Sequence, residues 1–149
     1  MSLETGIGFT SSPDTFLLAV EMPIRIAPQV DLGPLVQLGI SDRRTIVAPT
    51  LNARYSFDLT RWVTSERPLF KRLRPIAYGG LGFAYLHQDG RPGSDDDTGF
   101  LLDFGFGAEY DVADRVSVGS RMTFNFLPGD VLGENFFFSW QVATARFRF

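Results

Sequence analysis

Apolar residues alternate with small or charged ones along most of this chain, and few folds can accommodate that period of two. From Phe100 to Val112 every second residue is apolar, and the residues between them are mostly glycine or acidic. Segments 16–26, 47–57, 77–85 and 116–126 repeat the pattern. Because side chains of a β-strand point alternately to its two faces, the pattern predicts strands with one apolar face.

Stretches rich in turn-forming residues separate these segments, among them 59–74, 88–98 and 128–130. We therefore expect eight strands in a single domain spanning residues 1–149. We place them at Leu3–Phe9, Phe16–Ile26, Val30–Ile40, Ile46–Phe57, Pro75–His87, Gly99–Val112, Val116–Phe126 and Phe136–Phe149. Most have about 11 to 14 residues, which is longer than ordinary globular strands and long enough to cross a bilayer at a tilt.

Long antiparallel strands joined by short turns favour a closed up-and-down barrel. Many glycines share the small face, where they would make room inside a narrow barrel but would pack against nothing in water. The outward positions of the clearest strands carry no charge, as lipid contact requires. We predict an all-β, eight-stranded antiparallel up-and-down transmembrane β-barrel with its apolar face outward and a polar, glycine-rich lumen. A soluble lipocalin-like barrel, with the phenylalanine face lining a hydrophobic ligand pocket, is the alternative.

Charged residues on the glycine face would lie in the lumen and pair there. The expected lumen charge network comprises Glu21, Asp31, Asp103, Glu109, Arg25, Arg54, Arg121, Arg146 and Arg148, with Tyr78 and, as a further candidate, Trp140 beside it. Its cations are all arginine, whose planar fork suits buried carboxylates. Glu21 and Arg121 lie midway along their strands, so we expect them to meet.

Two features conflict with regular strands. Pro23, Pro34 and Pro49 fall inside them, and because proline donates no ladder hydrogen bond we expect a bulge or a break at each. The last strand changes character, since apolar residues from Phe136 to Val142 share a parity with Arg146 and Arg148. A bulge midway would switch its register.

Composition excludes several classes of function. The chain has 14 Lys and Arg against 17 Asp and Glu, so it lacks the basic excess of a nucleic-acid-binding protein. With no cysteine and one histidine, we expect no disulfide, no metal site and no cofactor. No apolar run is long enough for a transmembrane helix. The first residues lack the features of a leader, so the chain is either cytoplasmic or a mature form.

The glycine-aromatic segments 78–85 and 105–112, and the end Phe147-Arg148-Phe149, resemble the eight-stranded bacterial outer-membrane barrels related to the transmembrane domain of outer membrane protein A. The resemblance implies a mature outer-membrane protein with periplasmic termini. Phe147 and Phe149 would be the signal that the barrel assembly machinery reads. The bilayer and lipopolysaccharide would be its surroundings, and the barrel would be a monomer that serves as a structural or interaction protein with a filled lumen.

Some barrels of this kind modify lipid A with a histidine and a nearby serine, and Ser94 follows the only histidine, His87, by seven residues. His87 is followed by Gln88-Asp89-Gly90 and not by the serine-asparagine pair of the deacylases. A nucleophile needs its base within hydrogen-bond reach, so we expect no catalysis and keep the lipid A-modifying enzyme as a third hypothesis. Asp95–Asp97 lack the spacing of an EF-hand loop, so we expect a solvated loop.

The connection from Leu59 to Arg74 is basic and aromatic. Its expected membrane-interface residues are Arg61, Trp62, Phe70, Lys71 and Arg72. Aromatic rings and cations both gain in the headgroup plane, and a short helix over 68–73 would begin with proline in its first turn. An ordinary solvated loop is the alternative.

Overall fold

The computed structural model describes residues 1–12, 14–61, 71–90 and 93–149, and for residues 61, 90, 93–95 and 130 only the backbone. The strands are β1 (Ser2–Ser11), β2 (Thr15–Glu21), β3 (Ile24–Ala27), β4 (Val30–Ile40), β5 (Arg44–Ser56), β6 (Leu73–Gly90), β7 (Gly93–Ala113), β8 (Val116–Val131) and β9 (Glu134–Arg148). A short 3-10 helix, η1, covers Leu59–Arg61. Within the described residues no helix is long and apolar enough to cross a membrane.

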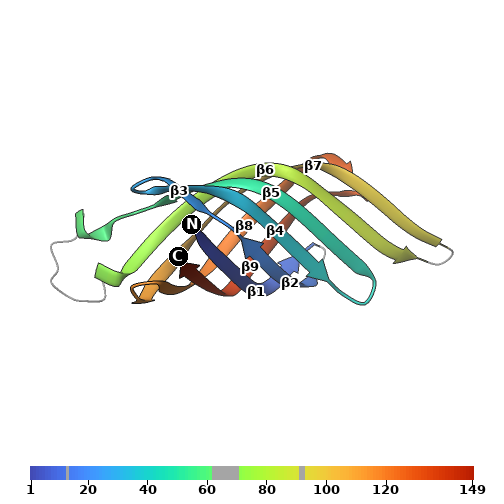
Figure 1. Ribbon diagram of the computed structural model, residues 1–149. Coiled ribbons are helices and arrows are strands. Elements are labelled where there is room, and N and C mark those ends of the chain that lie inside the picture. The colour runs from blue at the N-terminus through green and yellow to red at the C-terminus, as the bar shows by residue number, and fades with distance from the viewer. Residues whose placement is uncertain (13, 62–70, 91–92) are drawn as a thin grey trace.

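The strands form one closed antiparallel sheet (Figure 1). β1 pairs with both β2 and β9, and the sheet closes because β2 also pairs with β4. β3 pairs with β4 as well, so β2 and β3 are two parts of one interrupted strand and the barrel has eight strands in its wall. Both termini lie at one end of the barrel. At the opposite end, the β6–β7 hairpin extends farthest (Figure 1). The expected fold is confirmed.

The prolines account for the irregular places in the wall. Pro23 stands in the break between β2 and β3, where its carbonyl accepts from the Ser2 amide at 3.1 Å. Pro34 stays in β4, paired with Leu51, so the expectation of an irregularity in its own strand is wrong. It lies opposite the β2–β3 break, where its carbonyl accepts from the Met22 amide and its missing N–H leaves no gap in the ladder. The β5–β6 ladder skips Ala48 and Pro49.

The expected bulge in the last strand lies at Val142. Ile7 pairs with Ala143 but the next residue, Gly8, pairs with Gln141, so Val142 is extra and both Val142 and Ala143 are exposed. A Cβ on Gly8 would lie 1.7 Å from the Trp140 carbonyl oxygen, which is why only glycine fits there. The bulge leaves Trp140 on the outer wall, stacked edge-on against Phe9, so its candidate place in the lumen is wrong.

The two faces of the wall are sorted as expected, because the apolar set points outward. Phe83 and Phe104 are more than half exposed, whereas the alternate positions are buried. The lipocalin-like alternative requires the phenylalanine face to line the interior, and the structure places it outside.

The end of the lumen away from the termini is apolar, which the expectation of a polar lumen missed. Its buried cluster, which we call the apolar plug, consists of Ile46, Ala48, Ala84, Leu86, Leu101, Leu127, Val131 and Phe137. Beyond Phe126, β8 no longer pairs with β7, and its register with β9 shifts until Val131 pairs with Glu134. Leu127 and Val131 are buried there. β8 thus continues through the turn expected at 128–130, and the chain reverses at Leu132 and Gly133, both with positive φ.

Two expected loops need correction. β6 and β7 stay paired as far as Gly90 and Gly93, so 88–98 is mostly a hairpin ribbon and Asp95–Asp97 belong to a strand. The two strands stay hydrogen-bonded beyond the point where apolar residues stop alternating with polar ones. A two-stranded ribbon with water on both faces has no face to bury, so it carries no alternating pattern. The helix expected over 68–73 falls mainly outside the described residues, and β6 begins at Leu73.

Candidate functional site in the barrel lumen

Two buried arginines and three glutamates form the centre of the lumen charge network. The Arg54 guanidinium donates to Glu4 at 2.8 Å and to Glu21 and Glu109 at 2.5 Å each. Arg121 donates to Glu21 at 2.5 Å and also contacts Glu4. Arg54 and Arg121 are each 1% exposed. The expected contact between Glu21 and Arg121 is confirmed.

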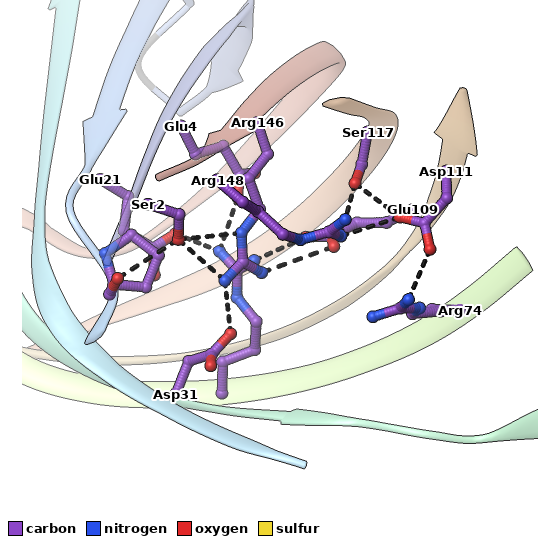
Figure 2. A network of polar contacts seen from close by, with 12 residues as sticks. Ser2, Glu4, Glu21, Asp31, Arg74, Glu109, Asp111, Ser117, Arg146 and Arg148 are labelled. Atoms are coloured by element: carbon purple, nitrogen blue, oxygen red, sulfur yellow. Dashed lines mark hydrogen bonds and ion pairs between the residues drawn. The ribbon is translucent and has the colours of Figure 1, made fainter. Parts of the chain in front are cut away.

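A second group continues the network toward the termini (Figure 2). Arg146 donates to Asp31 at 2.6 Å and to the Ser2 hydroxyl at 2.9 Å, and it lies 3.6 Å from Glu109. Arg25 pairs with Asp31 at 3.1 Å, but its side chain is 46% exposed. Arg25 therefore sits at the rim of the lumen and not inside it.

A third group occupies the rim beside the start of β6 (Figure 2). Asp111 accepts from Arg74 at 2.5 Å and from Arg148 at 2.8 Å. Ser117 donates to the same carboxylate at 2.7 Å. These contacts tie β6, β7, β8 and β9 together at the end that carries the termini.

Asp103 lies apart from the arginines. The Asn52 amide donates to Asp103 at 3.4 Å. Among the described residues no ion pair joins Asp103 to the network, so its expected membership in that network is wrong. Arg121 instead lies over the ring of Tyr78, 5.3 Å from its centre. The Tyr78 hydroxyl bonds to Thr123 at 2.8 Å, which confirms Tyr78 as a lumen residue.

A neutral polar belt separates the charges from the apolar plug. The Ser139 hydroxyl donates to Gln37 at 2.8 Å, Gln37 donates to Asn125 at 3.3 Å, and Asn125 donates to Ser139 at 3.1 Å. Gln37 belongs to β4, whereas its partners belong to β8 and β9, so the belt spans the lumen. The lumen is thus filled in three layers. Ion pairs lie at the end that carries the termini, amides and hydroxyls lie in the middle, and apolar side chains lie at the opposite end.

The sequence reasoning omitted several of these residues. Glu4 lies on the same face of β1 as Gly6 and Gly8. The rule that placed the other acids in the lumen, a shared face with glycines, therefore also predicts Glu4 there. Asp111 continues the series of Asp103 and Glu109 along β7. The amides and hydroxyls of the polar belt gave no comparable signal, because uncharged polar residues also occur on solvated strand faces.

His87 contacts two acids. Its Nδ1 is paired with Asp96, the residue opposite it in the β6–β7 ladder, and its Nε2 lies 3.3 Å from Asp89. Ser94 pairs with Asp89 in that ladder and not with His87. The backbone register therefore does not place the serine opposite the histidine.

The contact between His87 and Asp96 should respond to pH. Hydrogen bonding to Asp96 raises the pKa of His87 above its ordinary value of 6.5, and bonding to His87 lowers the pKa of Asp96 below 3.8. The pair therefore stabilises the hairpin tip fully between about pH 3.8 and 6.5. This contribution is lost as the pH rises through the folded-state pKa of His87 or falls through that of Asp96.

An NMR titration of the His87 ring in micelles measures this directly. Asp96→Asn should lower the pKa of His87 toward its ordinary value, and Asp89→Asn should lower it less, because Asp89 makes the longer contact. An unchanged pKa in Asp96→Asn would show that the two side chains do not interact in solution.

The other expected site residues lie at the surface or outside the described part. Of the membrane-interface residues, Trp62 and Phe70 lie outside the described residues, as does the side chain of Arg61, while Lys71 and Arg72 are exposed. Phe147 and Phe149 are exposed on the outside, and their role as an assembly signal stays a prediction. Among the described side chains no group of three acids or histidines could hold a metal ion.

No protein-family model and no curated protein matches the sequence. Solved structures do match over nearly the whole chain. Neisserial surface protein A has 16% identity and a TM-score of 0.75, with 99% of this chain and 95% of that one covered. The N-terminal β-barrel domain of Pseudomonas aeruginosa OprF has 13% identity and a TM-score of 0.71, with 99% and 97% covered. The outer membrane enzyme PagL has 11% identity and a TM-score of 0.59, with both chains fully covered. The fold is that of the eight-stranded outer-membrane β-barrels.

Proposed function

We propose that this chain is a small barrel of the bacterial outer membrane that serves as a structural or interaction protein, without catalysis or free conduction. The observation that carries the proposal is the filled lumen inside an apolar wall. Arg54 and Arg121 bridge β1, β2, β5, β7 and β8 through the three glutamates. An eight-stranded lumen is narrow enough for side chains to close, and here ion pairs, the polar belt and the apolar plug occupy it in succession.

The surroundings of such a barrel are the bilayer and lipopolysaccharide. The exposed phenylalanines of the wall support contact with lipid, since Phe83 and Phe104 would otherwise face water. We further propose a monomer that the assembly machinery recognises through Phe147 and Phe149, and no nucleic-acid partner.

Two measurements test the proposal together: insertion into a membrane or micelle, and the absence of a steady ionic current. The refolded chain should migrate differently on gels when unheated, and in planar bilayers it should show little or no steady current. A monomer soluble at high concentration without detergent would contradict the membrane location. Stable, large, frequently open channels would contradict the filled lumen.

A lipid A-modifying activity is the other candidate, and the fold shared with PagL is the observation that favours it. Against it, both ring nitrogens of His87 contact carboxylates, which leaves neither to serve a serine as general base. Mass spectra of lipid A from cells that express the chain should show unchanged acyl chains. A loss of acyl chains that His87→Ala abolishes would establish an enzyme.

A further inference from the structure

The outer wall has a hollow near the end that carries the termini. It measures about 660 Å³ and is lined chiefly by Ile7, Leu73, Tyr110, Val118, Ala143 and Ala145. This volume falls within the roughly 300–1,000 Å³ typical of ligand sites. We call this depression the wall hollow.

The wall hollow arises from a step in side-chain size. One row of paired residues, Phe106, Met122, Trp140 and Phe9, crosses β7, β8, β9 and β1. In the next outward-facing row toward the termini, Ala108 pairs with Ser120 and Ala143 pairs with Ile7. Three of these four side chains are short, so the surface drops below the aromatic row.

The β9 bulge contributes to the same place. Val142 and Ala143 both point outward there, and the ladder to β8 is shifted between Gly119 and Arg121. The Ser120 hydroxyl on this wall is not free, because it accepts from Trp140 Nε1 at 2.9 Å and donates to the Gln141 carbonyl at 3.0 Å. Apart from the hydroxyls of Thr5 and Tyr110, the outward-facing side chains that line the wall hollow are apolar. A bilayer would have to fill it with hydrocarbon to avoid lost contacts.

Two cations outside the lining of the wall hollow lie next to it in the sequence, at the same end of the barrel. Lys71 and Arg72 directly precede Leu73, which forms one side of it, and both are exposed. Within the described residues neither has an ion-pair partner. The neighbouring turn carries Asp114 and Arg115, whose charges cancel. Arg72 borders a depression that also contains Asp111 and Asp114, but Asp111 already pairs with Arg74 and Arg148. The polar edge therefore keeps a net positive charge, which complements an anion.

We infer that the wall hollow binds one anionic phospholipid, with an acyl chain against the alanines and the phosphate against Lys71 and Arg72. The inference rests on the proposed function, because the termini mark the periplasmic end only in an outer-membrane barrel. Because the wall hollow lies at the end that carries the termini, the bound lipid then belongs to the inner, periplasmic leaflet of the outer membrane. Apolar contact and charge then act on the same lipid.

Native mass spectrometry of the full chain in detergent, titrated with phosphatidylglycerol, tests the inference. We expect an adduct of one lipid per chain, tighter than with zwitterionic phosphatidylethanolamine. The double variant Lys71→Gln/Arg72→Gln should bind phosphatidylglycerol about 30-fold more weakly, which corresponds to about 1 kcal/mol for each cation near an anionic membrane surface. It should no longer distinguish the two lipids.

Ala143→Phe fills the wall hollow and should reduce adducts with both lipids. Val36→Phe is the matched control, because Val36 is an exposed wall residue of β4 outside the wall hollow. Equal adducts in these two variants would overturn the inference, and so would a dimer that Ala143→Phe dissociates, because a second copy would then cover the surface. Heat-dependent gel migration of each variant reports insertion separately, so a failed barrel is not mistaken for a missing lipid site.

Discussion

Replacing Arg54 by methionine should lower the free energy of unfolding of the barrel by roughly 3–5 kcal/mol, the usual cost of removing one partner from a buried ion pair. Arg54 contacts Glu4, Glu21 and Glu109 at 2.5–2.8 Å. The loss of this cation leaves three buried carboxylates to share the remaining arginines. Methionine keeps an unbranched apolar stem but lacks the guanidinium, so the variant removes the cation and its hydrogen bonds. The Arg25→Met control makes the same chemical change at the rim.

Urea unfolding of the barrel refolded into lipid vesicles, followed by tryptophan fluorescence, measures this loss. Arg25→Met is the matched control, because Arg25 is 46% exposed and its partner Asp31 also has Arg146. The control should cost no more than about 1 kcal/mol. Equal losses in the two variants would mean that the centre of the lumen is not held by its charges.

Rescue variants separate charge from misfolding. Adding Glu21→Gln to Arg54→Met removes one stranded carboxylate and should restore part of the lost stability. In the wild-type background, a double-mutant cycle of Glu21→Gln and Arg121→Met should show coupling, since the two side chains are 2.5 Å apart. Additive losses would show that this contact contributes nothing to stability.

The sequence was sufficient to place most members of this network but not to pair them. Parity with the glycines put Glu21, Arg54 and Arg121 in the lumen, because a strand has only two faces. Which acid meets which arginine depends on the stagger between strands. The change of parity in the last strand indicates a bulge, but it does not fix the stagger between that strand and its neighbours. Asp103 shows the limit of this reasoning. It lies on the lumen face, but among the described residues it contacts Asn52 and no arginine.

The apolar plug was missed for a different reason. Leu101 and Ala84 stand on the glycine face, but single apolar residues there are too few in any one strand to indicate a cluster. The cluster forms only when closure brings β5, β6, β7, β8 and β9 around one space. Leu127 and Val131 flank Pro128-Gly129-Asp130, whose composition indicates a turn and not a buried segment.

Phe137→Ala should cost roughly 3–5 kcal/mol of unfolding free energy, as is typical when a buried phenylalanine is truncated and leaves a cavity. Phe137 is 1% exposed within the apolar plug. Phe104→Ala removes the same atoms from the outer wall, where lipid can fill the space, so the loss there should be smaller. Urea unfolding in vesicles compares the two, and equal losses would show that the plug is not tightly packed.

The same variant should remain silent in planar bilayers. Beneath Phe137 the hydrogen bonds among Gln37, Asn125 and Ser139 still cross the lumen, and the arginine network lies beyond them. Loss of stability without a gain of current would therefore show that closure of the barrel does not depend on the apolar plug. A steady current from Phe137→Ala, absent from the wild type, would instead make the plug the barrier, and the polar groups below it would then line a water-filled path.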